Sequence, residues 1–203
     1  VPYLSVSKVR EIQVLMLGGI ESKGIFTISG GSNVLGAINA AGGIQKNGSF
    51  RKIEVRRGGE TIQMVDLYDI FVFGNFNLSN ALRSGDSIFV HPSGPIVPVA
   101  GGVNYEALYE VLPGDNLEDL IGFAGGFSAG FSGYDSVTVT RVDLNEIKKI
   151  SVNLDSLRTF EIQSRDSLLV PSYNNSVASI KKVSIDGMVQ RLSLIHISEP
   201  TRR

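Results

Sequence analysis

The sequence predicts an α+β fold of two tandem units, each a small mixed sheet with one helix on its face. Three observations predict it. The chain repeats itself at a spacing of 83 residues, each copy carries short apolar runs separated by turns, and each copy holds one apolar stripe of helical spacing. The composition agrees with a folded, turn-rich protein, because 42% of the 203 residues are hydrophobic and 23 are glycine.

The internal repeat aligns residues 14–44 with residues 97–127 without a gap, and both copies close alike, with SGDSIFV at 84–90 and SRDSLLV at 164–170. Two shorter matches keep the same register: 183–189 on 14–20, and 1–2 on 170–171. These matches are typical of a slice through a tandem array. We therefore predict the end of a preceding unit and a linker at 1–10, repeats at 11–94 and 95–175, and a linker with the start of a further repeat at 176–191.

The last residues do not continue this pattern. Residues 192–202 have the sequence LSLIHISEPTR, which resembles the translated read-through of a sequencing adaptor, and we expect 192–203 to be an artefactual tail. The whole chain carries 19 basic and 20 acidic residues, a balance that disfavours a nucleic-acid partner. The absence of cysteine excludes disulfides and thiolate chemistry, and no apolar run reaches the length of a membrane helix.

Within each repeat, the pattern predicts a hairpin, a helix, a second hairpin, a short irregular crossing and a final strand. In the first repeat Ser32 is expected to cap the helix, which ends at Gly42. In the second repeat Asp115 and Glu118 are expected to form a capping box, and the helix ends at Gly125. The predicted inward stripes are Val34, Ala37, Ile38 and Ala41, and Leu117, Leu120, Ile121 and Ala124. The predicted strands are 14–17, 25–28, 53–57, 61–65 and 88–90, with 137–141, 147–152 and 168–170 in the second copy.

This order of elements has β-grasp character. The first repeat carries the motifs Gly18-x-Ile20, Gly24-x-Phe26, Ala41-Gly42-Gly43, Val65-Asp66-Leu67 and Leu82-x-x-Gly85-Asp86-x-Ile88-x-Val90. Together these motifs resemble the soluble-ligand-binding β-grasp (SLBB) domain. Departures occur at Lys23-Gly24 and Glu106-Ala107, where the family has Pro-Gly, and at Arg165, where it has glycine.

The resemblance to SLBB domains of Wza-type polysaccharide export proteins implies a function. It implies non-catalytic structural repeats of a periplasmic, outer-membrane-associated protein that form part of an oligomeric export conduit. The implied partners are further copies of the chain, a polysaccharide and an inner-membrane export protein. The alternative is a soluble module that binds a glycan or a small ligand. An enzyme is not expected, and no cofactor, metal or catalytic residue is predicted.

The residues of the sequence that could take part in catalysis or in anion binding each have a structural explanation. His91 follows the last strand of the first repeat, where the second repeat has Pro171, and we expect an exposed strand-end histidine. Gly30-Gly31 precedes a helix but is explained by a turn, since neither a P-loop nor a dinucleotide motif is present. The carboxylate pairs Asp66 with Asp69 and Glu118 with Asp119 are expected to cap helices or face solvent rather than to act as glycosidase pairs.

Charged and aromatic side chains supply the candidate contacts. A basic strip on the second hairpins is expected to be a solvated edge, with an acidic glycan or a neighbouring subunit as the alternative; it comprises Arg51, Lys52, Arg56, Arg57, Arg141, Lys148 and Lys149. Tyr105 and Tyr109 are expected to point to one face. An aromatic cluster of Phe71, Phe73 and Phe76 is expected to lie mostly in the core. The candidate ligand contacts are Tyr105, Tyr109, Arg57 and Arg141.

Overall fold

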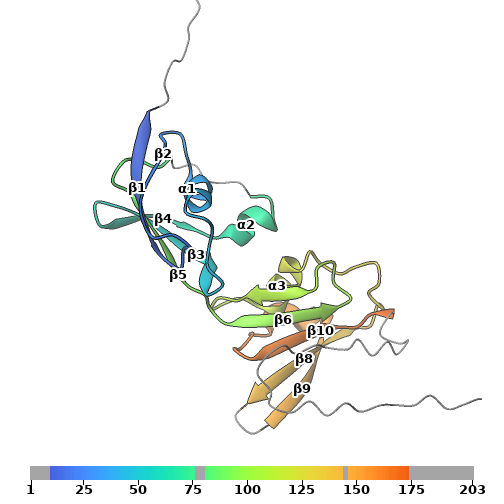
Figure 1. Ribbon diagram of the computed structural model, residues 1–203. Coiled ribbons are helices and arrows are strands. Elements are labelled where there is room, and N and C mark those ends of the chain that lie inside the picture. Colours follow the sequence, from blue (N-terminus) through green and yellow to red (C-terminus); the bar gives the residue numbers. More distant parts are fainter. Residues whose placement is uncertain (1–9, 76–80, 144–145, 174–203) are drawn as a thin grey trace, which may run out of the picture.

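The computed structural model describes residues 10–75, 81–143 and 146–173 (Figure 1). Several predicted features lie outside these residues. They are the preceding unit at 1–10 apart from Arg10, Phe76, most of the turn at 143–145, the further repeat expected at 176–191, and the tail at 192–203.

The first repeat is a five-stranded mixed sheet of order β2-β1-β5-β3-β4. The pairing of β1 with β5 is parallel, and the pairings of β1 with β2, β3 with β4 and β3 with β5 are antiparallel. The elements are β1 (Glu11–Gly18), β2 (Gly24–Ser29), α1 (Val34–Ala40), β3 (Gly48–Arg57), β4 (Glu60–Val65), α2 (Leu67–Phe71) and β5 (Ser87–Pro92).

The second repeat has the same topology, with sheet order β7-β6-β10-β8-β9. Here the parallel pair is β6 with β10. The elements are β6 (Ile96–Gly101), β7 (Ala107–Glu110), α3 (Leu117–Phe123), β8 (Ser136–Asp143), β9 (Glu146–Asn153), the 3-10 helix η1 (Leu154–Thr159) and β10 (Asp166–Val170). The α+β fold of two tandem mixed sheets, each with a helix, is confirmed.

Each repeat has its own hydrophobic core between sheet and helix. All eight residues of the two predicted helical stripes are buried, because short helices gain stability by burying one apolar face. Gly18 and Gly101 end the first strand of each repeat with φ of +80° and +97°. A Cβ at either position would lie about 2 Å from the carbonyl oxygen of Val90 or Val170, so glycine is required there.

The helix caps differ from the prediction by one residue. Asn33, not Ser32, caps α1 and accepts from the Gly36 N–H. The capping box of α3 is formed by Asn116 and Asp119 rather than by Asp115 and Glu118. Both Asn and Asp are good caps, so local preference did not distinguish them. Asp115 instead accepts from the Leu112 N–H and binds Arg51.

Two further expectations were wrong. The predicted irregular crossings contain the short helices α2 and η1. Phe71 and Phe73 do not lie in the core, since 67% and 48% of their surfaces are exposed. Arg165, by contrast, adopts a φ of +74° close to the +91° of its counterpart Gly85, so the turn is kept at a cost in strain.

Candidate functional site: the junction between the repeats

Two of the candidate ligand contacts are arginines that form the same internal ion pair in both repeats. Arg57 donates from Nε and Nη2 to Asp86 at 2.7 and 2.8 Å, and Arg141 donates to Asp166 at 2.8 Å from both nitrogens. The Arg57 guanidinium holds the pKa of Asp86 below its usual value, although burial opposes the shift. The pairs tie the second hairpin to the last strand of each repeat, so these guanidiniums have structural partners.

The two candidate tyrosines have different surroundings. Tyr109 is 8% exposed and its hydroxyl donates to the Tyr105 carbonyl oxygen at 2.8 Å, whereas Tyr105 is 68% exposed. Because Tyr105 precedes β7 instead of belonging to it, the period-two expectation of one shared face does not hold. Only Tyr105 presents its ring to solvent, and its role as a ligand contact stays a prediction.

The single histidine of the described residues is part of a polar cluster on the outer face of the first sheet. His91 is half-buried and its Nε2 lies 3.1 Å from Glu54 Oε2, while Arg56 donates to the same oxygen at 2.6 Å. The Arg56 hydrogen bond, aided by the Thr61 hydroxyl and by His91 and opposed by burial, lowers the pKa of Glu54 from 4.5 to about 2. The cluster is structural, and His91 is less exposed than expected.

This cluster predicts acid sensitivity. Between pH 4.5 and 2 the unfolded chain takes up a proton at Glu54 that the folded chain does not, so the stabilisation by Glu54 is complete above about pH 4.5 and is lost as the pH falls toward 2. Urea unfolding from pH 6 to 2 should show a weaker pH dependence in Glu54→Gln than in the parent chain. Glu60→Gln, at the exposed first residue of β4, is the control and should match the parent slope; equal slopes in all three would contradict the prediction.

The carboxylate pairs have structural roles. Asp66 caps α2 by accepting from the Tyr68 N–H at 2.8 Å and also binds Arg51. Glu118 pairs with Arg158, and Asp119 completes the capping box. Asp66 and Asp119 therefore cap helices, as expected. Asp66 and Glu118 also form ion pairs, with Arg51 and Arg158 respectively.

The densest polar network of the described residues joins the two repeats. Glu110, at the end of β7, is 3% exposed. Its carboxylate accepts from Ser49 Oγ at 2.7 Å, from the Phe50 N–H at 2.9 Å and from the Gly94 N–H at 2.8 Å. A buried carboxylate is tolerated when its oxygens are satisfied in this way, so the second repeat places a hydrogen-bonded charge against the start of β3.

Arg51 forms the other half of this junction. Its Nε donates to Asp66 of its own repeat at 2.9 Å, and its Nη1 and Nη2 bind Asp115 of the second repeat. Nη1 also donates to the Glu110 carbonyl oxygen at 3.2 Å. Burial lowers the pKa of Arg51, but the hydrogen bonds and charges of Asp115 and Asp66 outweigh it and leave the pKa above its usual value. Burial also raises the pKa of Asp66, an effect partly offset by the Tyr68 N–H and by Arg51.

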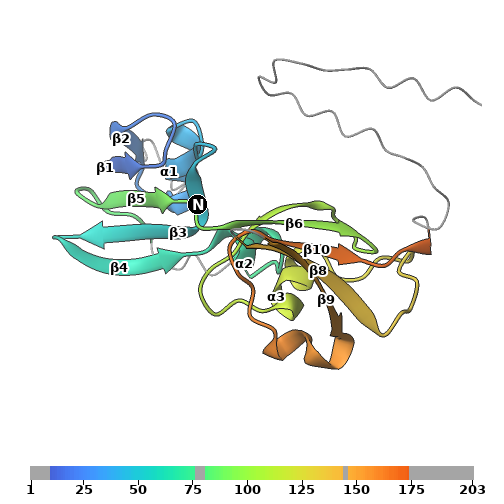
Figure 2. The ribbon, with the colours of Figure 1, turned by 90° about the horizontal axis from the view of Figure 1, so that it is seen from below.

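Aromatic rings surround this arginine. Its guanidinium carbon lies 5.1 Å from the Tyr68 ring centre and 4.6 Å from that of Phe123. Tyr68 on α2 and Phe123 on α3 meet edge to face at 5.1 Å, so these two helices lie side by side (Figure 2). The Tyr68 hydroxyl accepts from the Glu110 N–H at 2.9 Å, and Phe73 contacts Phe123. Phe73, which was expected in a core, therefore serves the contact between the repeats.

Sequence reasoning missed Glu110 and Ser49 and assigned Arg51 to an exposed edge. A signal was available in the comparison of the two copies. In the 83-residue register, Glu110 and Asp115 of the second repeat replace Thr27 and Ser32 of the first. Acidic residues that appear in only one copy belong to contacts that only that copy makes.

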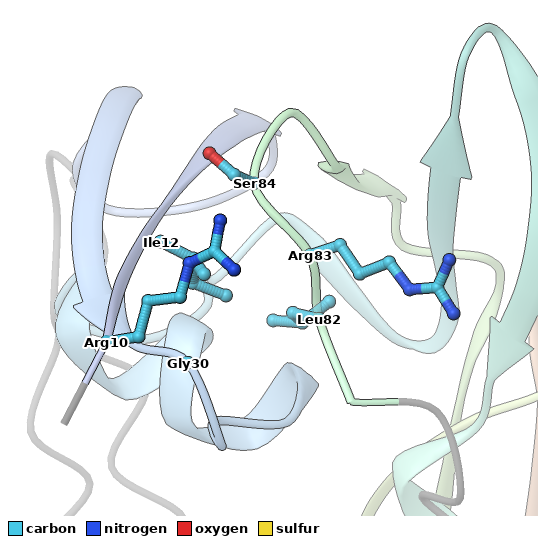
Figure 3. Close-up of a pocket in the computed structure, with 6 residues that line it drawn as sticks. All are labelled: Arg10, Ile12, Gly30, Leu82, Arg83 and Ser84. Carbon is cyan, nitrogen blue, oxygen red and sulfur yellow. The ribbon is translucent and has the colours of Figure 1, made fainter.

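A separate pocket of about 510 Å³ lies at the far side of the first repeat from this junction, lined by Arg10, Ile12, Gly30, Leu82, Arg83 and Ser84. Figure 3 shows the Arg10 guanidinium reaching toward the Ser84 loop beside Ile12 and Leu82, while the Arg83 side chain points away. The pocket thus combines one guanidinium and one hydroxyl with an apolar wall. Gly30 contributes as part of a turn, and its N–H is already bonded to the Arg10 carbonyl at 2.7 Å.

The described residues contain no group of three or more His, Cys, Asp or Glu side chains placed to hold a metal ion. None of the helices in this part of the chain has the length and apolarity needed to span a membrane.

The fold and the site define a class of protein, in which tandem α+β modules of β-grasp type are joined by a buried polar junction. Comparison with family models matches the SLBB domain twice, at residues 13–66 and 96–147. This chain belongs to the SLBB domain family. The first match covers both hairpins and the helix of its repeat, whereas the second ends at Ile147, near the start of β9. Both matches stop before the last strand of the repeat.

Two curated relatives, both polysialic acid transport proteins KpsD of Escherichia coli, are each 29% identical to this chain over 102 residues. The alignment covers 50% of this chain and 18% of each relative. The chain therefore corresponds to less than a fifth of the length of these relatives.

Proposed function

We propose that these repeats are a non-catalytic structural part of a polysaccharide export protein of the bacterial cell envelope, and that they build the wall of an oligomeric conduit. The observation that carries this proposal is the junction at Glu110 and Arg51, because it joins two small β-grasp units into one stiff element. The SLBB family membership and the names of the two relatives support the same reading. Further copies of the chain, a polysaccharide and an inner-membrane export protein are the proposed partners.

A segment exchange tests this proposal. In Escherichia coli that depends on KpsD for surface polysialic acid, the matching segment of KpsD is replaced by residues 10–173 of this chain. We expect surface polymer to be retained by this chimera and lost with Arg51→Ala, whose repeats are no longer locked together. Lys52→Ala, an exposed neighbour in the same strand, is the matched control and should behave like the parent chimera.

The proposal is overturned if the parent chimera is present in the envelope at the normal amount but exports no polymer. Equal export by the parent and Arg51→Ala chimeras would show that a stiff junction is not needed. The mass of the purified chimera in detergent, measured by analytical ultracentrifugation, tests the proposed oligomer separately.

The Arg10 pocket favours a second candidate function, the binding of an acidic sugar. A guanidinium binds carboxylates by paired hydrogen bonds, and the apolar wall of Ile12 and Leu82 suits the less polar face of a sugar ring.

This candidate makes a direct prediction. Titration of the 203-residue chain with a sialic acid oligomer should shift the NMR amide signals of Ser84 and Gly30, and Arg10→Ala should weaken binding by about tenfold, the loss expected for one charge-assisted pair. Lys23→Ala, in the exposed turn between β1 and β2, controls for net charge. No shifts at millimolar oligomer, or equal losses in both variants, would contradict the assignment.

A further inference from the structure

Residues 131–133, which precede β8, are the counterpart of residues 48–50 at the start of β3. Gly48 begins β3 and lies against Gly19, and Phe131 lies in the same way against Gly102 of the second repeat. The residue after each is a serine, Ser49 in one copy and Ser132 in the other. The serine that binds Glu110 at the junction therefore has an equivalent on the far side of the second repeat.

The two serines differ in their bonding. Ser49 Oγ donates to Glu110 and accepts the N–H groups of Arg51 and Lys52. Ser132 Oγ is buried and has no hydrogen-bond partner among the described residues. A buried hydroxyl without a partner is destabilising. The Ser132 hydroxyl therefore occupies the position that Ser49 has in the first repeat, but within the described chain it lacks an acceptor equivalent to Glu110.

The second donor of the junction is also repeated. Phe50, whose N–H binds Glu110, corresponds to Gly133, and no bond from the Gly133 N–H is found within the described residues. A hydroxyl and a backbone N–H therefore lie together, as the Ser49 and Phe50 donors do. We define Ser132 and Gly133 as the second notch.

Apolar side chains surround the second notch. A groove of about 290 Å³ is lined by Ser132 with Tyr134, Thr138, Leu169, Pro171, Ser172 and Tyr173. Tyr134 is 66% exposed and Leu169 is 45% exposed. The first repeat has a cavity of about 250 Å³ at the start of β3, and there Leu108 and Glu110 of the second repeat form part of the lining.

We infer that the second notch and its groove are the docking surface for a following β-grasp repeat of the same chain, which places a carboxylate from the end of its second strand on Ser132 and Gly133. The inference extends the proposed function, since it rests on the same stacking of repeats. The chain itself indicates this occupant, because Glu110 comes from such a strand and residues 183–189 match the first strand of a repeat. Val183 follows Val170 by 13 positions, whereas Val97 follows Val90 by 7, so the connection is long enough.

The second junction differs from the first in one respect. No arginine follows Ser132, where the sequence is Gly133-Tyr134-Asp135. A carboxylate at the Asp115 position of the next repeat would then lack the guanidinium that Asp115 has. The docked face is expected to be apolar at that point and to pack on Tyr134.

Amide hydrogen exchange tests the inference with an internal reference. A three-repeat chain is made from residues 1–181 followed by a copy of 96–173, in which the copied Asp115 is changed to Asn. The Gly133 amide of the three-repeat chain should exchange at least about tenfold more slowly than the Gly133 amide of the 203-residue chain. This is the protection expected from one charge-assisted hydrogen bond. Changing the copied Glu110 to Gln should restore fast exchange, while the Phe50 amide stays equally protected in all three chains.

Equal Gly133 exchange in the two-repeat and three-repeat chains, with slow amides in the strands of the copy to show that it is folded, would overturn the inference. Protection of Gly133 in the 203-residue chain that grows with protein concentration would also overturn it, because the occupant would then be a second chain. These outcomes are independent of the export test, which depends on the first junction.

A second measurement needs no third repeat. Ser132→Ala in the 203-residue chain should leave the urea unfolding midpoint unchanged or raise it, since the hydroxyl lost has no partner. Ser49→Ala, which removes three hydrogen bonds, should lower the midpoint. A clear loss with Ser132→Ala would show that the hydroxyl already has a partner within the chain, and this would overturn the inference.

Discussion

Replacing Glu110 with alanine is expected to lower the free energy of unfolding by about 3 kcal/mol, because a buried, charge-assisted network loses its acceptor. Three donors are left unpaired: the Ser49 hydroxyl and the N–H groups of Phe50 and Gly94. These groups belong to the first repeat and to the connection, whereas Glu110 belongs to the second repeat. The loss should therefore appear as a loosened junction, with each repeat still folded.

Urea unfolding followed by circular dichroism and by amide exchange measures this effect. We expect the parent chain to unfold in one transition and Glu110→Ala to show two, since the coupling between the repeats is removed. Glu110→Gln should retain part of the coupling, because it keeps one oxygen acceptor but turns an amide donor toward other donors. A single unshifted transition in Glu110→Ala would contradict the account; Glu60→Ala, which changes an exposed carboxylate, is the control.

Replacing Arg51 with alanine is expected to have the largest effect in the chain, a loss of about 3–5 kcal/mol, the range measured when one partner of a buried ion pair is removed. Asp66 and Asp115 would then face each other without a counter-charge, and two of the rings at the junction, Tyr68 and Phe123, would lose the guanidinium between them. Each of the two carboxylates is less than a quarter exposed, so water compensates only in part.

The pattern of variants separates charge from geometry. Arg51→Lys keeps the charge but not the planar fork that reaches both carboxylates, so it should recover less than half of the loss. Arg51→Ala combined with Asp115→Asn should recover stability, since one uncompensated charge is removed. Lys52→Ala should change the unfolding free energy by less than about 0.5 kcal/mol, as expected for an exposed position. If Arg51→Ala is no more harmful than Lys52→Ala, the junction does not hold the repeats together.

The repeat register, the order of strands and the helical stripes could be predicted from the sequence because each depends on a periodic pattern. Val34 with Ala37 and Leu117 with Leu120 are buried for a local reason, since their spacing places them on one helix face. The glycines at 18 and 101 could be recognised as equivalents for the same reason. The resemblance to the SLBB domain could also be recognised from local sequence patterns, because the family's motifs consist of turn residues and core positions.

The partners of the basic strip were decided by contacts across long stretches of sequence. Arg51, Arg56 and Arg57 lie within one strand, yet each binds a different carboxylate, and Arg51 reaches a residue 64 positions away. Local pattern does not distinguish a strand residue that faces solvent from one that faces a second domain, because both are polar and both alternate with apolar residues.

Two β-grasp units and the order of their elements along the chain could be predicted from the sequence, since propensity, periodicity and turn chemistry all act within a few residues. The roles of the charged side chains depend on tertiary packing. Whether Glu110 is a surface acid or a buried link depends on which donors the packing of two separately formed units brings to it, and Ser49 and Phe50 come from the other unit. The same dependence leaves Ser132 with a buried hydroxyl and no partner in the described chain.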